Sequence, residues 1–308
     1  MARVVGDNRR MATNVNNGPD DFIGITIDSG TGESLVGGVL EPEGAAIAAV
    51  VVHPATGVTQ GLYRRFARHL ADAGFAVLIY DYSGCGDSAA KGDDRRTDLR
   101  MSDWMLHDIP AANARARELW PDLPLLAVGH SVGSHGQIAV QSESPVEALA
   151  MIASHAGITA LIPNLREKAR VWAFFNLVVP VTSRLFGRVP VAEIGMGKPI
   201  PLGALTQWAR WSRDRGYFFA DEEFDFERRY GQARFPVLSV CFADDDWATR
   251  RATGELTRRM PAAEITEVDV APSSGEAIGH MGFFRSPNAA RWPEVTAWLR
   301  ERAGARRV

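Results

Sequence analysis

The sequence predicts an α/β fold in which a mostly parallel sheet carries helices on both faces. Uniformly apolar runs recur along the chain and are typical of strands buried on both faces of a parallel sheet. Segments with a helical spacing of apolar residues separate these runs. The 308 residues are 46% hydrophobic and 23% charged, an ordinary globular composition, and they suffice for a core without disulfide or metal support.

The sheet is expected to begin with a pair of antiparallel strands. Residues 22–28 and 34–40 alternate apolar and polar side chains around a glycine-containing turn, which is typical of a hairpin. Residues 45–52 (AAIAAVVV) form the first buried run. A helix over about 62–73 and a second buried run at 76–80 then complete a βαβ unit.

Later segments continue this alternation up to the carboxyl end. We expect further strands at 125–129, 148–153, 237–242 and 264–270, and helices around 102–119, after 131, from about 249 and around 290–302. The resulting order of elements predicts a mostly parallel sheet with helices on both faces.

Four parts are expected along the chain. Residues 1–20 are polar and indicate a flexible tail, 21–156 hold the first part of the core, 157–232 form a helical insertion, and 233–308 complete the core. The insertion lacks a buried-strand run and is rich in aromatic residues. We expect most of these aromatics to form a small core of the insertion itself and a minority to face a cleft.

Composition also excludes several classes of protein. The formal charge is −3 and the basic residues form no stripe, so nucleic acid is not an expected partner. Two cysteines, Cys85 and Cys241, do not make a disulfide framework or a cysteine-based zinc site. No secretory signal or membrane span is recognisable, so a cytoplasmic location is expected. The oligomeric state stays open.

A candidate nucleophile follows the expected strand 125–129. Gly129, Ser131 and Gly133 form a G-x-S-x-G motif between a buried strand and a helical segment. Such a sharp strand-to-helix turn leaves no room for side chains two positions either side of the serine. The motif indicates a nucleophilic Ser131, and the alternative is a strand-ending turn with a capping serine.

A serine hydroxyl needs an imidazole as base and a carboxylate that orients the imidazole. Six of the seven histidines precede the last expected strands, and only His280 follows them, in a glycine-flanked loop. Asp244, Asp245 and Asp246 follow the expected strand 237–242. Because like charges raise the pKa of one another, we do not expect all three to point into one site, and capping of the helix that begins near Thr249 would explain one or two of them.

With nucleophile, acid and base in this order, residues 22–303 resemble the α/β-hydrolase superfamily. Residues 53–57 (HPATG) are similar to its oxyanion loop, 81–88 (DYSGCGDS) to its D-x-R-G-x-G-x-S segment, and 279–284 (GHMGFF) to its histidine loop. The family pattern implies Asp245 as the acid, with Asp246 as the alternative. Phe242 replaces the usual glycine, and Ser83 replaces the usual arginine, which removes an expected ion pair.

The resemblance also implies the surroundings of the nucleophile. The backbone amides of Val132 and Ala55 would form the oxyanion hole, since Pro54 has no N–H to donate. The insertion corresponds to the family's cap. Within the superfamily the chain looks most like bacterial serine-aminopeptidase and monoacylglycerol-lipase-like hydrolases. His135 and His155 could line the pocket, but we favour structural hydrogen bonding for both.

We therefore expect a serine hydrolase that needs no metal or cofactor and acts on a small-molecule carboxylic ester with a hydrophobic part. An alternative on the same scaffold is an aminopeptidase-like amidase, which would need an acidic cap residue to hold the substrate amine; Asp221, Glu222 and Glu223 are candidates by location. Acyl transfer to an alcohol or thiol is a variant. A non-catalytic binding module is the alternative of another class.

Overall fold

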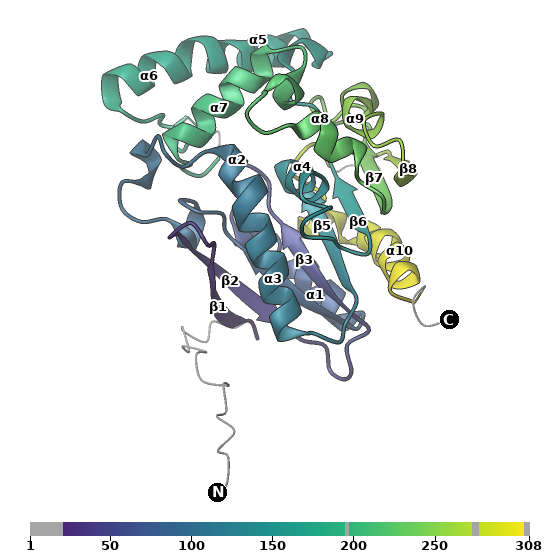
Figure 1. Ribbon diagram of the computed structural model, residues 1–308. Coiled ribbons are helices and arrows are strands. Elements are labelled where there is room, and N and C mark those ends of the chain that lie inside the picture. The colour runs from purple at the N-terminus through teal and green to yellow at the C-terminus, as the bar shows by residue number, and fades with distance from the viewer. Residues whose placement is uncertain (1–20, 195–196, 273–276, 305–308) are drawn as a thin grey trace, which may run out of the picture.

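The computed structural model describes residues 21–194, 197–272 and 277–304, so the expected tail 1–20 lies outside the described residues. Within them, eight strands form one sheet in the order β1-β2-β4-β3-β5-β6-β7-β8 (Figure 1). The strands are β1 Ile23–Asp28, β2 Ser34–Leu40, β3 Ala48–His53, β4 Phe75–Tyr80, β5 Leu125–His130, β6 Leu149–Ile152, β7 Pro236–Phe242 and β8 Glu264–Val270. The pairs that β2 forms with β1 and β4 are antiparallel, and the other pairs are parallel. The predicted fold class is confirmed.

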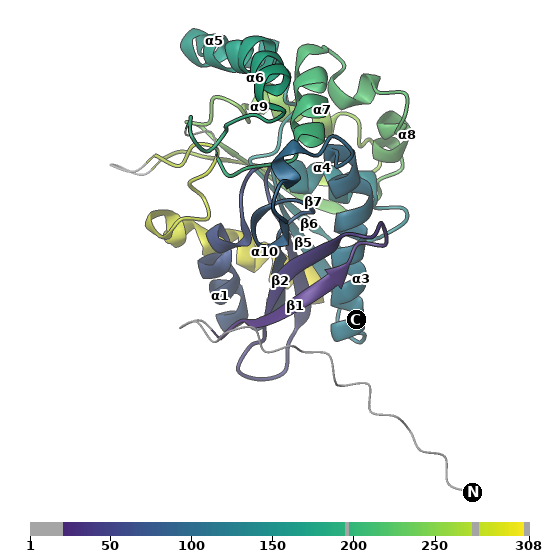
Figure 2. The ribbon, with the colours of Figure 1, turned by 90° about the vertical axis from the view of Figure 1, so that its left-hand side faces the viewer.

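Helices cover both faces of the sheet (Figure 2). Helices α1 (Arg64–Asp72) and α10 (Trp292–Gly304) pack on the face that carries Val50 and Val52. Helices α3 (Ile109–Leu119) and α4 (Val132–Ala139) pack on the face that carries Val51. Because side chains alternate along a strand, one apolar run supplies both cores. Helix α9 is Arg250–Thr257, and none of the described helices has the length and apolarity needed to cross a bilayer.

Two π-helical segments interrupt longer helices. The expected helix 102–119 consists of α2 (Met101–Asp103), a π segment (Trp104–Asp108) and α3. A second π segment, Phe174–Val178, precedes α6 (Val179–Phe186). Each π segment ends two residues before a proline, Pro110 or Pro180. Proline has no N–H and its ring clashes with the carbonyl four residues earlier, so a wider turn before it is the physical reason.

The segment between β6 and β7, residues 157–232, is here called the cap. Its described residues contain no strand. Its helices are η5 Thr159–Leu161, α5 Leu165–Ala173, the π segment η6 Phe174–Val178, α6 Val179–Phe186, α7 Leu202–Arg213, η7 Tyr217–Ala220 and α8 Phe226–Gly231. α5, α6 and α7 lie beyond the carboxyl ends of the parallel strands (Figure 1). This is the position expected for a cap.

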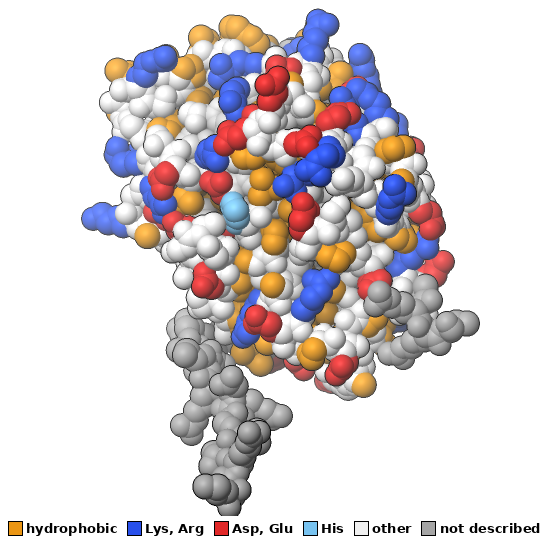
Figure 3. Space-filling view, viewed as in Figure 1, with side chains coloured by type: hydrophobic (Ala, Val, Ile, Leu, Met, Phe, Trp, Pro, Cys, Tyr) orange, Lys and Arg blue, Asp and Glu red, His pale blue; other side chains and the backbone are white. Residues whose placement is uncertain are grey.

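The expectation that the cap aromatics form a separate core is wrong. Phe175, Trp211 and Phe218 belong to the same apolar cluster as the side chains between α3 and the sheet. The reason is that α7 packs on α2 and α8 packs on α4, which joins the cap to the core. Trp172 of α5 and Phe186 of α6 are instead exposed. Figure 3 shows apolar side chains along the upper edge of the molecule.

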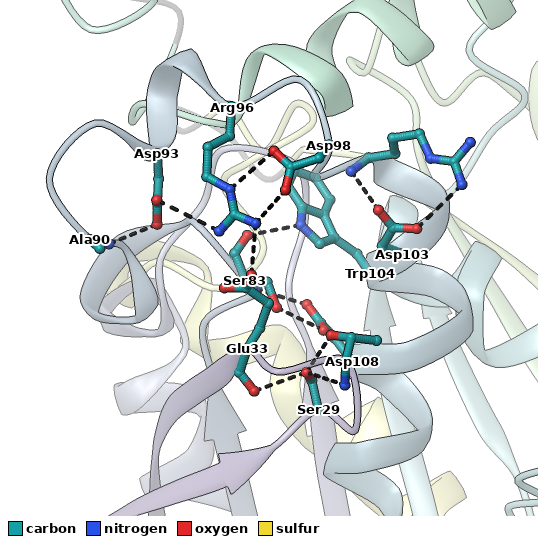
Figure 4. Close-up of polar contacts among 12 residues, drawn as sticks. Ser29, Glu33, Ser83, Ala90, Asp93, Arg96, Asp98, Asp103, Trp104 and Asp108 are labelled. Carbon is teal, nitrogen blue, oxygen red and sulfur yellow. Dashed lines mark hydrogen bonds and ion pairs between the residues drawn. The ribbon is translucent and has the colours of Figure 1, made fainter.

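Ser83, which replaces the arginine of the resembling family, contacts a buried carboxylate. Its N–H and its hydroxyl donate to Asp108 at 2.8 and 2.9 Å, and its carbonyl accepts from Trp104 Nε1 at 3.0 Å (Figure 4). No cation of the described residues forms an ion pair with Asp108. Burial raises the pKa of Asp108 to about 7, although the two hydrogen bonds from Ser83 oppose the shift. The carboxyl is thus partly protonated near neutral pH.

We expect Asp108→Asn to change the pH dependence of stability. The folded-state pKa exceeds the ordinary value of 3.8, so Asp108 stabilises the fold below about pH 4 and loses this contribution as the pH rises through about 7. An asparagine can accept from Ser83 N–H and donate to its hydroxyl without carrying charge. Urea unfolding from pH 4 to 8 should therefore show the variant gaining stability relative to wild type by a few kcal/mol as the pH rises. Parallel pH curves would contradict this.

Candidate active site

Ser131 occupies a strained turn between β5 and α4. Its backbone has φ 52° and ψ −115°, in a region that a residue with a Cβ rarely adopts. A Cβ at Gly129 would lie 2.5 Å from Ser134 N, and a Cβ at Gly133 would collide with the carbonyl of His53. The two glycines that the motif contains are thus required by close backbone packing. Ser131 lies directly after the carboxyl end of β5, a central strand, and it borders a cavity.

The structure brings Ser131, His280 and Asp245 together in one hydrogen-bonded series. His280 Nε2 lies 3.3 Å from Ser131 Oγ, and His280 Nδ1 lies 2.8 Å from Asp245 Oδ2. The Asp245 side chain is 1% exposed and the His280 side chain is 18% exposed. With Nδ1–H donating to the carboxylate, Nε2 is free to accept the serine proton.

The environment of Asp245 keeps it ionised. Burial alone would raise its pKa, but the attraction of His280 and their hydrogen bond outweigh burial, so the pKa of Asp245 is lowered to about 2. Its second oxygen accepts from the backbone N–H of Trp247 at 2.8 Å and of Ala248 at 3.0 Å. A fixed negative charge therefore lies behind the imidazole at neutral pH.

The neighbouring aspartates have other positions. Asp244 accepts from the backbone N–H of Ile278 at 2.7 Å and of Gly279 at 3.0 Å, which holds the loop that carries His280. Asp246, the alternative acid, is half-buried and forms no hydrogen bond with His280 within the described residues. Capping of the next helix by these aspartates is also wrong, because Thr249 caps α9 by accepting from Ala252 N–H.

The amide of Ala55 differs from the expectation for an oxyanion hole. Its N–H donates to the hydroxyl of Tyr63 at 2.9 Å and is therefore already engaged. The sequence could not show this, because the hydroxyl comes from the residue before α1. In the described part of the chain, the amides of Thr56 and Val132 meet no acceptor, and both residues lie beside Ser131 or the cavity. Both are therefore available as donors beside Ser131.

Tyr63 and His130 connect the loop after β3 to the loop that carries His280. The Tyr63 hydroxyl donates to His130 Nδ1 at 2.9 Å, and His130 Nε2 donates to the His280 carbonyl at 2.9 Å. Since a carbonyl only accepts, His130 must carry its proton on Nε2. Burial lowers the pKa of His130 to about 3, so it stays neutral. Sequence reasoning assigned neither residue a role, although His130 lies inside the G-x-S-x-G motif.

A cavity of about 430 Å³ lies between Ser131, His280 and the cap. Most of its wall is apolar and aromatic, and both cap and core contribute. The apolar side chains that line it are Ala55, Val58, Phe174, Val191, Ile200, Leu205, Trp208, Trp247 and Met281. Arg170, Lys198 and Arg285 also line it, and no carboxylate of the described residues does. The expected minority of cap aromatics at a cleft is thus found.

One cap helix is attached directly to the loop of the acid. Trp247 Nε1 donates to Glu167 of α5 at 2.7 Å, and Arg170 holds the same carboxylate with two hydrogen bonds of 2.8 and 2.5 Å. The Trp247 ring lies 5.7 Å from the His280 ring, centroid to centroid. This contact fixes the position of α5 relative to the imidazole.

The remaining candidate residues lie outside this cavity. His155 borders the His280 ring edge-on, with centroids 5.2 Å apart, and His135 packs against Tyr217 and Phe218. Burial lowers the pKa of His135 and of His155 to about 3. Among the described residues, no group of three or more His, Cys, Asp or Glu side chains is arranged to hold a metal ion.

The three cap carboxylates named for an amine-binding role also lie elsewhere. Asp221 accepts from Trp211 Nε1 at 2.6 Å and pairs with Arg210, and Glu223 pairs with Arg100 at 2.8 Å. Glu222 is exposed, and none of the three lines the cavity. The three candidates for the alternative, amine-binding function therefore do not lie at this cavity.

A protein-family model described as serine aminopeptidase, S33, matches residues 44–270. This chain therefore belongs to that family of serine hydrolases and to the α/β-hydrolase superfamily. No curated protein sequence matches the chain.

Solved structures share the fold at low identity. An esterase from Pyrococcus furiosus has a TM-score of 0.60 at 15% identity, covering 97% of this chain and 96% of that one. A thermostable carboxyl esterase from Bacillus coagulans has a TM-score of 0.58 at 12% identity, with 92% and 99% covered. A monoacylglycerol lipase from Paleococcus ferrophilus has a TM-score of 0.57 at 15% identity, with 87% and 99% covered. These similarities establish the fold.

We expect Tyr63→Phe to destabilise the protein by about 2 kcal/mol, because it leaves His130 Nδ1 and the Ala55 amide without their partner. Urea unfolding measures the loss. Tyr230→Phe is the matched control, since the Tyr230 hydroxyl is also buried but makes only a 3.3 Å bond to the His135 carbonyl. If Tyr63→Phe lowers the free energy of unfolding no more than Tyr230→Phe does, the two hydrogen bonds of the Tyr63 hydroxyl do not stabilise the fold as expected.

Proposed function

We propose that this protein is a serine hydrolase that cleaves carboxylic esters through an acyl-enzyme on Ser131. The observation that carries the proposal is the series Asp245–His280–Ser131 at the wall of the apolar cavity, with bonds of 2.8 and 3.3 Å. Membership of a serine hydrolase family supports it. The apolar wall favours a substrate with a hydrophobic part.

The residues have distinct roles in the proposed reaction. His280 Nε2 takes the Ser131 proton as Oγ bonds to the ester carbonyl carbon, and Asp245 stabilises the imidazolium that forms. When the tetrahedral intermediate collapses, the ester C–O bond breaks and His280 returns the proton to the departing alcohol. A water molecule then attacks the acyl-enzyme with His280 as base, which releases the carboxylic acid and restores Ser131.

The oxyanion of both intermediates needs fixed N–H donors. In our proposal the Val132 amide is one donor, as the sequence led us to expect. The second is the Thr56 amide, which meets no acceptor among the described residues, while Ala55 can take part only after its bond to Tyr63 opens. The donors are main-chain groups, so side-chain substitution alone would not remove them.

Ester cleavage is favoured over an aminopeptidase-like reaction. An amine-binding site needs a carboxylate within reach of the substrate, yet the described cavity wall carries only cations as charged groups. No observation favours acyl transfer to an alcohol or thiol over transfer to water. A purely binding function would not require the strained backbone of Ser131 or the buried charge of Asp245.

We expect a fluorophosphonate probe to label the wild type and not Ser131→Ala, because only an activated serine attacks phosphorus at a useful rate. Labelling is measured by intact-protein mass spectrometry. Ser212→Ala is the matched control, since Ser212 is buried in the cap and its hydroxyl has no partner within the described residues. A folded wild type that stays unlabelled would refute catalysis and favour a binding module.

We expect that replacing Asp244, Asp245 and Asp246 by asparagine, one at a time, lowers kcat most strongly at Asp245. Asp245→Asn should lower kcat for p-nitrophenyl butyrate by about four orders of magnitude, because an amide no longer fixes the His280 tautomer or stabilises the imidazolium. Asp246→Asn should have little effect, and Asp244→Asn an intermediate one, since Asp244 only holds the loop. Similar losses at all three positions would overturn the assignment of Asp245.

A further inference from the structure

Three cations from separate segments line the cavity beside Ser131. Arg170 comes from α5, Lys198 from the segment before α7, and Arg285 from the loop after His280. The whole protein has a formal charge of −3. The described residues of the cavity wall include three cations and no carboxylate, so the sign of the charge there is opposite to that of the whole protein. This arrangement produces a local positive potential.

Two of these cations are not neutralised. Arg170 is held by Glu167 through two hydrogen bonds, so the pair carries no net charge. Lys198 and Arg285 are exposed and form no ion pair with any described carboxylate. Some cap arginines away from the cavity are paired instead, for example Arg188 with Glu193 at 2.8 Å. Two positive charges at the cavity wall are therefore available to a bound anion.

The backbones of both residues are fixed to the loops around Ser131. Lys198 N–H donates to the Gly57 carbonyl at 3.1 Å, which attaches it to the loop after β3. Arg285 N–H donates to the Gly282 carbonyl at 3.0 Å, five residues beyond His280 in sequence. The two side chains thus start from anchored positions in two different walls of the cavity.

We propose that the substrate is an ester with an apolar part and an anionic group, a carboxylate or a phosphate, which Lys198 and Arg285 attract. This inference rests on the proposed ester hydrolysis. Arg binds either anion with two parallel hydrogen bonds, and Lys adds a point charge. Phe174 and Trp208 supply the apolar contact on the cap side. The anionic group takes no part in bond making and stays on the acid or the alcohol product.

The test compares charged and neutral esters of matched shape. Mono-p-nitrophenyl glutarate against p-nitrophenyl butyrate places a carboxylate on the acyl side. Para-butyryloxybenzoate against its methyl ester places it on the alcohol side, and para-butyryloxyphenyl phosphate replaces the carboxylate by a phosphate. In at least one pair, we expect kcat/KM of the wild type to be on the order of tenfold higher for the anion at low salt. Added salt should reduce this preference, because a Debye length of about 8 Å near 0.15 M screens exposed charges.

Variants assign the preference to the two cations. Lys198→Met and Arg285→Met should each lower the ratio of anionic to neutral kcat/KM by about three- to fivefold through KM, and the double variant should lose its salt dependence. Lys91→Met and Arg234→Met are the matched controls, since both are exposed and neither lines the cavity. They should keep the wild-type ratio.

The two proposals fail in different ways. A wild type that hydrolyses the neutral esters but shows no preference for any anion would overturn the anionic substrate and leave ester hydrolysis standing. An anion preference that survives in the double variant would overturn the assignment to Lys198 and Arg285. A wild type that hydrolyses no member of any pair would overturn both proposals.

Discussion

The tight backbone turn at Ser131 is the constraint on which the arrangement of the site depends. β3 and β5 are parallel neighbours in which His53 is opposite Gly129, so the loop after β3 and the turn after β5 start at the same edge of the sheet. The absence of a Cβ at Gly133 lets α4 begin against the His53 carbonyl. Ser131 and the loop after β3 are therefore held at a separation that any larger residue at Gly133 would change.

The segments that follow β7 and β8 carry Asp245 and His280 and complete the site. Three consecutive carboxylates follow β7, but successive side chains of a turn point in different directions, so only Asp245 reaches the imidazole. Asp244 instead fixes the start of the histidine loop. A single buried carboxylate avoids the like-charge repulsion that would protonate one member of a pair. Within this run, Asp245 thus has an electrostatic role and Asp244 a structural one.

The sequence predicts well those features that depend on local pattern. Buried strands appear as apolar runs, and the glycines around Ser131 mark the turn because backbone contacts exclude any side chain there. Contacts between distant residues are not encoded in this way. Tyr63 accepts from the Ala55 amide through the fold of the loop between β3 and α1, and Lys198 and Arg285 meet at one cavity although 87 positions separate them. The core that the cap shares with α4 likewise depends on tertiary packing.

The charged groups around His280 differ between its buried side, where Asp245 lies, and the exposed side of the cavity, where Lys198 and Arg285 lie. Burial holds the pKa of His130 and of His155 at about 3, so both neighbours stay neutral and do not oppose a positive charge on His280. The ionised Asp245 is the buried group that favours this charge. The positive charges of Lys198 and Arg285 are exposed, where water and salt screen their effect on the imidazolium but a bound anion can still contact them. The same protein can therefore stabilise an imidazolium inside the site and attract an anion at the cavity.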